Sequence, residues 1–161
     1  MTSREPFARL VETHQQAVRA LLRRLCGDPA EADDLAQEVF IAAWTGLDSF
    51  RQGADFRLWL YGIAWRKFQA SRRAAARRHN REAVVAETAE TAATPDADTR
   101  HDLQKAMMAL SEPQRAAVAL CLAAGVSHGD AAVLLALPLG TVKAHVARGR
   151  ARLLSMLGER P

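Results

Sequence analysis

Apolar residues recur every three or four positions along most of this 161-residue chain, and the strict alternation that forms β-strands is absent. Such spacing gathers the apolar side chains on one face of a helix, where packing can bury them. Hydrophobic residues make up 49% of the sequence, enough for a packed core. The pattern therefore predicts an all-α fold. The first apolar face consists of Phe7, Leu10, Val11, His14, Ala17, Val18, Leu21, Leu22 and Leu25.

Glycine, proline and N-capping residues divide the first half of the chain into separate helices. The first helix is expected to end at Gly27, because glycine readily adopts the left-handed conformation that terminates helices. Asp28 and Pro29 suit the N-cap and the first position of a second helix. A loop at residues 48–55 then leads into the longest helix, which we expect over residues 56–81.

The last third of the chain has the spacing of a helix-turn-helix domain. Ser111 and Ser127 are suited to cap two helices, and a turn at residues 136–138 precedes a last helix over residues 139–157. In this arrangement the last helix enters the major groove of DNA. Its expected buried residues are Val142, Val146, Leu153 and Leu157. Its expected exposed residues are Thr141, Lys143, His145, Arg148, Arg150 and Arg152.

Residues 82–97 differ in composition from the segments on either side. They are rich in Ala, Thr and acidic residues, lack aromatic residues and contain Pro95. We interpret this stretch as a flexible acidic linker between two small helical domains, residues 1–81 and 98–161.

Charge alternates along the chain in blocks. Residues 51–81 carry 9 Lys and Arg against 1 Asp, whereas residues 1–50 carry 5 against 8 acidic residues. Residues 82–112 are again acidic, with 2 Lys and Arg against 7 Asp and Glu. Residues 113–161 are basic, with 6 Lys and Arg against 2 Asp and Glu. Two separated basic blocks predict two separate contacts with a polyanion.

Three aromatic residues of the segment 56–81 lie largely off its main apolar stripe. They are Tyr61, Trp65 and Phe68, and they are interleaved with or followed by Arg66, Lys67, Arg72 and Arg73. Exposed rings among cations suit single-stranded nucleic acid, whose bases stack on rings while its phosphates meet the cations. The alternative interpretation is a second core face followed by a solvated basic tail.

The second helix begins with a cluster of four carboxylates, Glu31, Asp33, Asp34 and Glu38. Part of this charge simply favours a helix N-terminus through the helix dipole. Four carboxylates in eight residues exceed what capping requires, so we predict an acidic docking face for a basic partner. A solvated face with no partner is the alternative.

The sequence carries no pattern of an enzyme, a metal site or a membrane protein. Its five histidines are scattered, and motifs such as H-E-x-x-H, C-x-x-C or a glycine-rich phosphate loop are absent. No apolar run approaches the ~18 residues of a membrane span, and no secretory signal is recognisable. Cys26 and Cys121 lie in apolar patterns, so we expect free thiols in a reducing cytosol. We predict a cytoplasmic, non-enzymatic protein without cofactor or metal.

Four segments together resemble bacterial sigma factors of the extracytoplasmic-function type. They are A-D-D-L-A-Q-E-V-F at 32–40, W-L-Y-G-I-A at 59–64 with Arg72-Arg73 after it, L-S-E-P-Q-R at 110–115 and L-G-T-V-K at 139–143. The resemblance covers nearly the whole chain, and the four segments occur in the expected order and at the expected spacing.

The resemblance implies an initiation factor for core RNA polymerase, with three sets of binding residues. Docking on the coiled coil of the largest polymerase subunit is implied for Asp33, Asp34, Gln37 and Glu38, and the polymerase flap is a second implied contact. Capture of the unwound −10 element is implied for Tyr61, Trp65, Arg66, Lys67, Phe68, Arg72 and Arg73. Reading of the duplex −35 element is implied for Thr141, Lys143, His145, Arg148 and Arg150. Control by an anti-sigma factor is also implied.

Four positions depart from the family pattern. Arg66 stands where asparagine is common, and Ala70 stands where aspartate is common. His145 replaces an arginine, so we expect a weaker phosphate contact than the permanently charged guanidinium of arginine would make. Ala136 replaces the glycine of the turn, so we expect a turn that stays near the right-handed helical region.

A stand-alone regulator is the main alternative, since T-V-K-A-H-V at 141–146 also resembles the recognition helix of LuxR-type regulators. Such a regulator would bind duplex DNA tightly by itself. A sigma factor would bind weakly without polymerase. The first half of the chain has neither a receiver nor a ligand-binding pattern, which favours the sigma factor.

Overall fold

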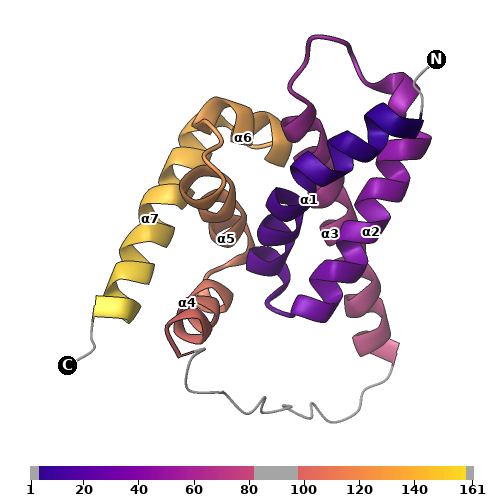
Figure 1. Ribbon diagram of the computed structural model, residues 1–161. Helices are drawn as coiled ribbons and strands as arrows, with labels where there is room; N and C mark the ends of the chain where they lie inside the picture. Colours follow the sequence, from indigo (N-terminus) through magenta and orange to yellow (C-terminus); the bar gives the residue numbers. More distant parts are fainter. Residues whose placement is uncertain (1–3, 82–97, 159–161) are drawn as a thin grey trace.

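The computed structural model describes residues 4–81 and 98–158, and within these residues it contains helices and no strands (Figure 1). The all-α prediction is confirmed, whereas the predicted linker at 82–97 lies outside the described residues. The first half consists of α1 (Arg4–Cys26), α2 (Pro29–Thr45), the short 3-10 helix η1 (Leu47–Ser49) and α3 (Phe56–Arg81). The second half consists of α4 (Asp98–Ala109), α5 (Glu112–Val118), the π-helical turn η3 (Ala119–Ala123), α6 (His128–Leu135) and α7 (Leu139–Gly158).

The helix boundaries are set by the caps that the sequence predicted. Gly27 has φ 76°, which ends α1 in the left-handed region, and the Asp28 side chain accepts a hydrogen bond from the Ala30 N–H at 3.0 Å. Ser111 and Ser127 likewise accept hydrogen bonds from backbone N–H groups three residues later, at 3.4 and 3.1 Å. Each of the three capping side chains, Asp28, Ser111 and Ser127, accepts a hydrogen bond from a backbone N–H that has no partner within the first helical turn.

The first half is a three-helix bundle in which α1, α2 and α3 pack against one another (Figure 1). Its centre contains Val18, Leu22, Val39, Leu60 and Phe68, all fully buried. Because α3 continues well past this centre, its last turns carry an exposed run of arginines. These are Arg73, Arg77, Arg78 and Arg81.

The second half contains the predicted helix-turn-helix, with α6 and α7 bent by 106° at the turn between them. Helix α5 packs on α7 at Gly149, where an added Cβ would lie 2.6 Å from the Val118 side chain. Val142, Val146 and Leu153 are buried as expected. Leu157, also expected to be buried, is 37% exposed because it lies in the last turn of α7, past the core.

Within the described residues, no single helix is both long enough and apolar enough to cross a membrane, and only the bent pair α6–α7 meets those criteria when its helices are joined.

The two halves pack against each other and share one continuous hydrophobic core. Helix α1 contacts α4, α5 and η3, and helix α3 contacts α6. In Figure 1, α6 lies beside the start of α3, and α5 lies beside α1. We call this shared boundary the seam.

The most deeply buried charged residue in the described chain lies at the seam. Arg115 is only 7% exposed, and its guanidinium donates three hydrogen bonds to backbone carbonyls. The acceptors are Met107 O at 3.1 Å, Leu110 O at 3.2 Å and Leu25 O at 3.0 Å. Met107 and Leu110 lie at the C-terminal end of α4, and Leu25 lies at the C-terminal end of α1. Arg115 therefore caps one helix C-terminus in each half, where the helix dipole favours a cation.

The turn of the helix-turn-helix differs from the sequence expectation. Ala136 has φ 53° and ψ 45°, which is the left-handed region rather than the right-handed one. The expectation was wrong because α6 must stop and reverse here. With Ala136 in the left-handed region, the backbone N–H of Leu137 donates a hydrogen bond to the carbonyl of Ala132 at 3.0 Å. This conformation costs a residue with a Cβ about 1–2 kcal/mol.

Replacing this strained alanine is expected to stabilise the protein. Ala136→Gly removes the Cβ clash and should raise the free energy of unfolding by about 1 kcal/mol, or the melting temperature by about 2–4 °C. Ala151→Gly, at an exposed position inside α7, is the matched control and should lower stability by about 1 kcal/mol. A destabilised Ala136→Gly variant in thermal or urea unfolding would contradict the assigned turn.

Candidate functional site

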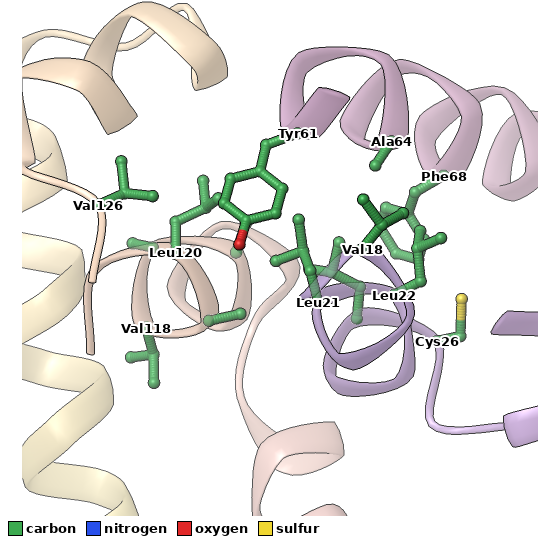
Figure 2. Close-up of a cluster of buried hydrophobic side chains, with 14 of the residues drawn as sticks. Val18, Leu21, Leu22, Cys26, Tyr61, Ala64, Phe68, Val118, Leu120 and Val126 are labelled. Atoms are coloured by element: carbon green, nitrogen blue, oxygen red, sulfur yellow. The ribbon is translucent and has the colours of Figure 1, made fainter. Parts of the chain in front are cut away.

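Two of the three aromatic residues predicted to stack on nucleic acid are buried. Phe68 is 0% exposed and lies in the three-helix core with Val18 and Leu22 (Figure 2). Tyr61 is 2% exposed and points into the seam, toward Leu120 and Val126 (Figure 2). The prediction that Tyr61 and Phe68 form an exposed stacking face is therefore wrong in this arrangement. Helix α3 is covered on two sides, by the first-half core and by the second half.

Trp65 is the member of this set that keeps partial exposure. Its ring stacks on Phe68 with centroids 5.7 Å apart and planes 29° apart, so the buried Phe68 holds a ring that is itself only partly buried. Arg72 lies over the Phe68 ring, with its guanidinium carbon 5.1 Å from the centroid, and is half-buried. Arg66 and Arg73 are exposed as predicted.

A hollow of about 210 Å³ lies between the end of α2 and the first turns of α3. Trp59 forms part of its wall, and Arg66 and Lys67 line it. Trp59 is held by an aromatic cluster with Phe50 and Phe56, at centroid distances of 5.2 and 5.4 Å. Nothing in the sequence indicated this hollow, because Gly46 and Ser49, which complete its wall, lie outside α3.

The acidic face of α2 is accessible at three of its four predicted positions. Asp34, Gln37 and Glu38 are exposed. Asp33 is instead turned toward α1 and pairs with Arg23 at 3.4 Å, so it contributes less to a free acidic surface.

The same face continues with two apolar residues that the sequence did not single out as exposed. Ile41 is 67% exposed, and Trp44 is 46% exposed with its ring 4.9 Å from that of Phe7. Trp44 lies in the last turn of α2, where its ring contacts Phe7 of α1. The accessible face of α2 is therefore acidic at one end and apolar at the other.

Helix α7 presents a cationic surface on the side away from its core. Lys143, Arg148 and Arg150 are exposed as predicted, whereas Thr141 and His145 are half-buried. Since successive helical residues turn by about 100°, the cations flank a central strip of small residues. This strip consists of Gly140, Ala144, Ala147 and Ala151. A strip without bulky side chains lets the helix backbone lie deep in a DNA groove, with cations toward the phosphates on both sides.

A groove of about 480 Å³ opens along the seam. Its floor includes Met107, Val118 and Leu153, and Arg23, Arg24 and Arg100 also line it. The groove is mostly apolar, and the exposed side chains of Leu103 and Leu122 extend it. Because its residues come from both halves, the groove exists only while the halves are packed together.

Burial shifts the Cys and His side chains of the described interior toward their neutral forms. Burial raises the pKa of the Cys26 thiol to about 12 and raises the pKa of the Cys121 thiol as well, so both remain neutral. Burial lowers the pKa of His14, whose ring lies 5.5 Å from that of Phe56. Within residues 4–81 and 98–158, no three His, Cys, Asp or Glu side chains are placed to hold a metal ion.

Comparison with known proteins matches both halves to one family. The family model described as Sigma-70 region 2 matches residues 10–78, and the model described as Sigma-70, region 4 matches residues 100–153. The ECF RNA polymerase sigma factor EcfG of Rhodopseudomonas palustris is 32% identical over 145 residues, which cover 88% of this chain and 79% of the relative. SigM of Mycobacterium tuberculosis, also an ECF RNA polymerase sigma factor, is 34% identical over 96% of this chain and 79% of its own.

The chain belongs to the extracytoplasmic-function family of sigma factors. It is therefore a DNA-binding initiation factor for bacterial transcription. Its fold matches that of the sigma factor RpoE from Bartonella quintana, solved in complex with the anti-sigma factor NepR. The TM-score is 0.84 and the identity 29%, over 98% of this chain and 99% of that one. The stand-alone regulator is not favoured, since the match includes the whole first half.

The burial of α3 in this sigma factor predicts losses of stability of different size for two neighbouring aromatic residues. Phe68→Ala empties a core position and should lower the free energy of unfolding by about 3–5 kcal/mol. Trp65→Ala should cost less than half as much, because its ring is partly exposed. Urea unfolding of the two variants checks this difference, and equal losses would contradict the assignment of the two rings.

Proposed function

We propose that this sigma factor uses three separate surfaces in initiation. The exposed face of α2 docks on core polymerase, the hollow beside Trp59 takes an unpaired base of the −10 element, and α7 reads the −35 element. The observation that carries the proposal is the exposure of all three surfaces among the described residues of one chain. The protein contributes binding and orientation, and RNA synthesis belongs to the polymerase.

Polymerase docking is supported by the composition of the α2 face. Its carboxylates at Asp34 and Glu38 would steer a basic partner, and an apolar end at Ile41 would supply contact area. Exposed large apolar side chains next to charges are typical of protein interfaces, where an aromatic or aliphatic anchor provides most of the affinity. The acid cluster alone would be compatible with a solvated face. The apolar continuation favours a partner.

Capture of a −10 base is supported by the hollow near Trp59. Separated strands expose unstacked bases, and a pocket of about 210 Å³ is large enough to enclose one. Arg66 and Lys67 lie where they can meet the phosphates on either side of that base. Trp65, six residues after Trp59 on α3, is partly exposed and is proposed to contact a neighbouring nucleotide. The roles predicted for Tyr61 and Phe68 are thereby reduced to support of the helix.

Recognition of the −35 element is supported by the exposed face of α7. Lys143 and Arg148 flank the small-residue strip on opposite sides, as expected for contacts to both phosphate backbones. Ala144 and Ala147 can approach base edges and contact thymine methyl groups. Thr141 and His145 are half-buried beside this face, so His145 is better placed to support the helix than to bind phosphate.

An anti-sigma factor is proposed to bind the groove along the seam. The RpoE relative was solved with an anti-sigma factor. In this chain the groove has an apolar floor and three arginines, which suit an amphipathic helix with an acidic polar face. A helix in this groove would contact both halves at once and hold them together.

Charge reversal on α2 tests polymerase docking. Asp34→Arg should weaken binding to bacterial core RNA polymerase at least tenfold and keep its helical content, because the residue is exposed. Glu12→Arg, an exposed reversal on α1, is the matched control and should bind like the wild type. The measurement is a titration of fluorescently labelled protein with core polymerase. Equal affinities of all three proteins would contradict the docking surface.

A further inference from the structure

One face of α3 continues from the hollow beside Trp59 to the C-terminal end of the helix. Since each residue turns an α-helix by about 100°, seven side chains of α3 fall within a sector of about 80°. They are Trp59, Ile63, Arg66, Ala70, Arg73, Arg77 and Arg81. The first three line the hollow, and every member from Arg66 onward is exposed. We call the last three of these residues, Arg73, Arg77 and Arg81, the arginine row.

The arginine row lies on a part of α3 that other elements leave uncovered. In Figure 1, the last turns of α3 extend beyond the point where α1 ends and α2 begins. Every residue from Ala75 to Arg81 is exposed, and none of them belongs to the hydrophobic core. Packing within the chain therefore does not explain the residues found here.

The charge of the row is not neutralised by the part of the chain that the structure describes. Helix α3 contains no Asp or Glu, and within residues 4–81 and 98–158 no carboxylate forms an ion pair with the row. Its members are four residues apart, and like charges at that spacing destabilise a helix. The helix dipole favours cations in the last turn, which accounts for Arg81 but not for Arg73 or Arg77. An anionic partner would account for all three.

The composition of this face indicates the class of anion. Beyond Arg66 it carries only Ala70 and the row, without an aromatic or large apolar side chain. Protein interfaces depend on such anchors, and sites for single-stranded DNA depend on rings that stack with bases. Duplex DNA keeps its bases stacked inside and presents a line of phosphates that cations alone can bind. Successive members of the row are about 6 Å apart along the helix axis, so the row can contact several phosphates.

We propose that the arginine row binds the phosphate backbone of the duplex DNA next to the captured −10 base. The inference rests on the proposed function, because the hollow on the same face takes the unpaired base. The first turns of α3 then hold unpaired DNA, and its last turns hold paired DNA. The change from unpaired to paired DNA lies between Arg66 and Arg73, over about 10 Å of the helix. Contacts of the row are independent of base sequence.

The salt dependence of DNA binding tests the row in the free protein. Each lost phosphate contact lowers the slope of log affinity against log salt concentration by about 0.9. Arg77→Gln should therefore lower the slope by about 1, and Arg73→Gln combined with Arg77→Gln by about 2. Arg77→Lys keeps the charge and should keep the slope. The measurement is fluorescence anisotropy of a labelled duplex of arbitrary sequence, titrated with each protein at several salt concentrations.

Arg78→Gln is the matched control for this measurement. Arg78 is also exposed and lies on the same last turns, but about 60° outside the sector that contains the row. Its loss should change the slope less than half as much as the loss of Arg77. Circular dichroism should show the same helical content in all variants, because the substituted residues are exposed. An unchanged slope for Arg77→Gln, or equal effects of Arg77→Gln and Arg78→Gln, would overturn the row.

A single strand of the same length distinguishes paired from unpaired DNA. Arg77→Gln should reduce affinity for the single strand less than affinity for the duplex. A larger loss on the single strand would overturn the assignment to duplex DNA.

Run-off transcription with bacterial core polymerase separates the row from the proposed function. On genomic fragments that the wild type transcribes, Arg77→Gln should reduce transcript several-fold as salt is raised, by a similar factor on every fragment. Arg78→Gln should resemble the wild type. Unchanged transcription by Arg77→Gln at every salt concentration would overturn the role of the row at promoters. Transcripts from none of the proteins, with the slopes changing as expected, would contradict the proposed function and leave the row supported as a duplex-binding site.

Discussion

The arrangement of this sigma factor depends on one buried guanidinium that caps two helix C-termini. Arg115 contacts carbonyls at the ends of α1 and α4, which lie in different halves of the chain. This residue of the second half thereby satisfies the Leu25 carbonyl of the first half together with two carbonyls of its own half, at a position that is only 7% exposed. Apolar side chains at the seam, including Tyr61 and Val126, bury further surface between the halves. Arg115 determines where the two halves meet.

Packing of the two halves decides which residues of α3 remain available for DNA. The helix is buried on the face that carries Phe68 and again at Tyr61, so the contacts proposed for the −10 element move to the hollow beside Trp59 and to Trp65. The exposed face of α2, which we propose docks on polymerase, and the outer face of α7 are not covered by the seam. The proposed docking and −35 surfaces are thus free while the halves are packed together, and their separation is fixed.

Local chemistry was predictable from the sequence, and contacts between distant segments were not. The caps at Asp28, Ser111 and Ser127 depend on neighbouring residues, so their spacing identified the helix boundaries. Periodicity shows which face of a helix carries its main apolar stripe. Helix α3 is covered on two sides, so Tyr61 is buried although it lies off that stripe. The burial of Arg115 was not predictable, because nothing nearby in sequence reveals that Leu25 O needs a donor.

The most direct measurement is the distance between the two halves in the free protein. Spin labels at Glu12→Cys on α1 and Ala151→Cys on α7, in a chain with Cys26→Ala and Cys121→Ala, occupy exposed positions in each half. Pulsed electron paramagnetic resonance should then give one narrow distance distribution, which broadens when Leu134→Glu is added, because that change places a carboxylate against α3 at Gly62. A broad distribution in the otherwise unchanged chain would contradict the claim that its own contacts hold the two halves of the sigma factor together.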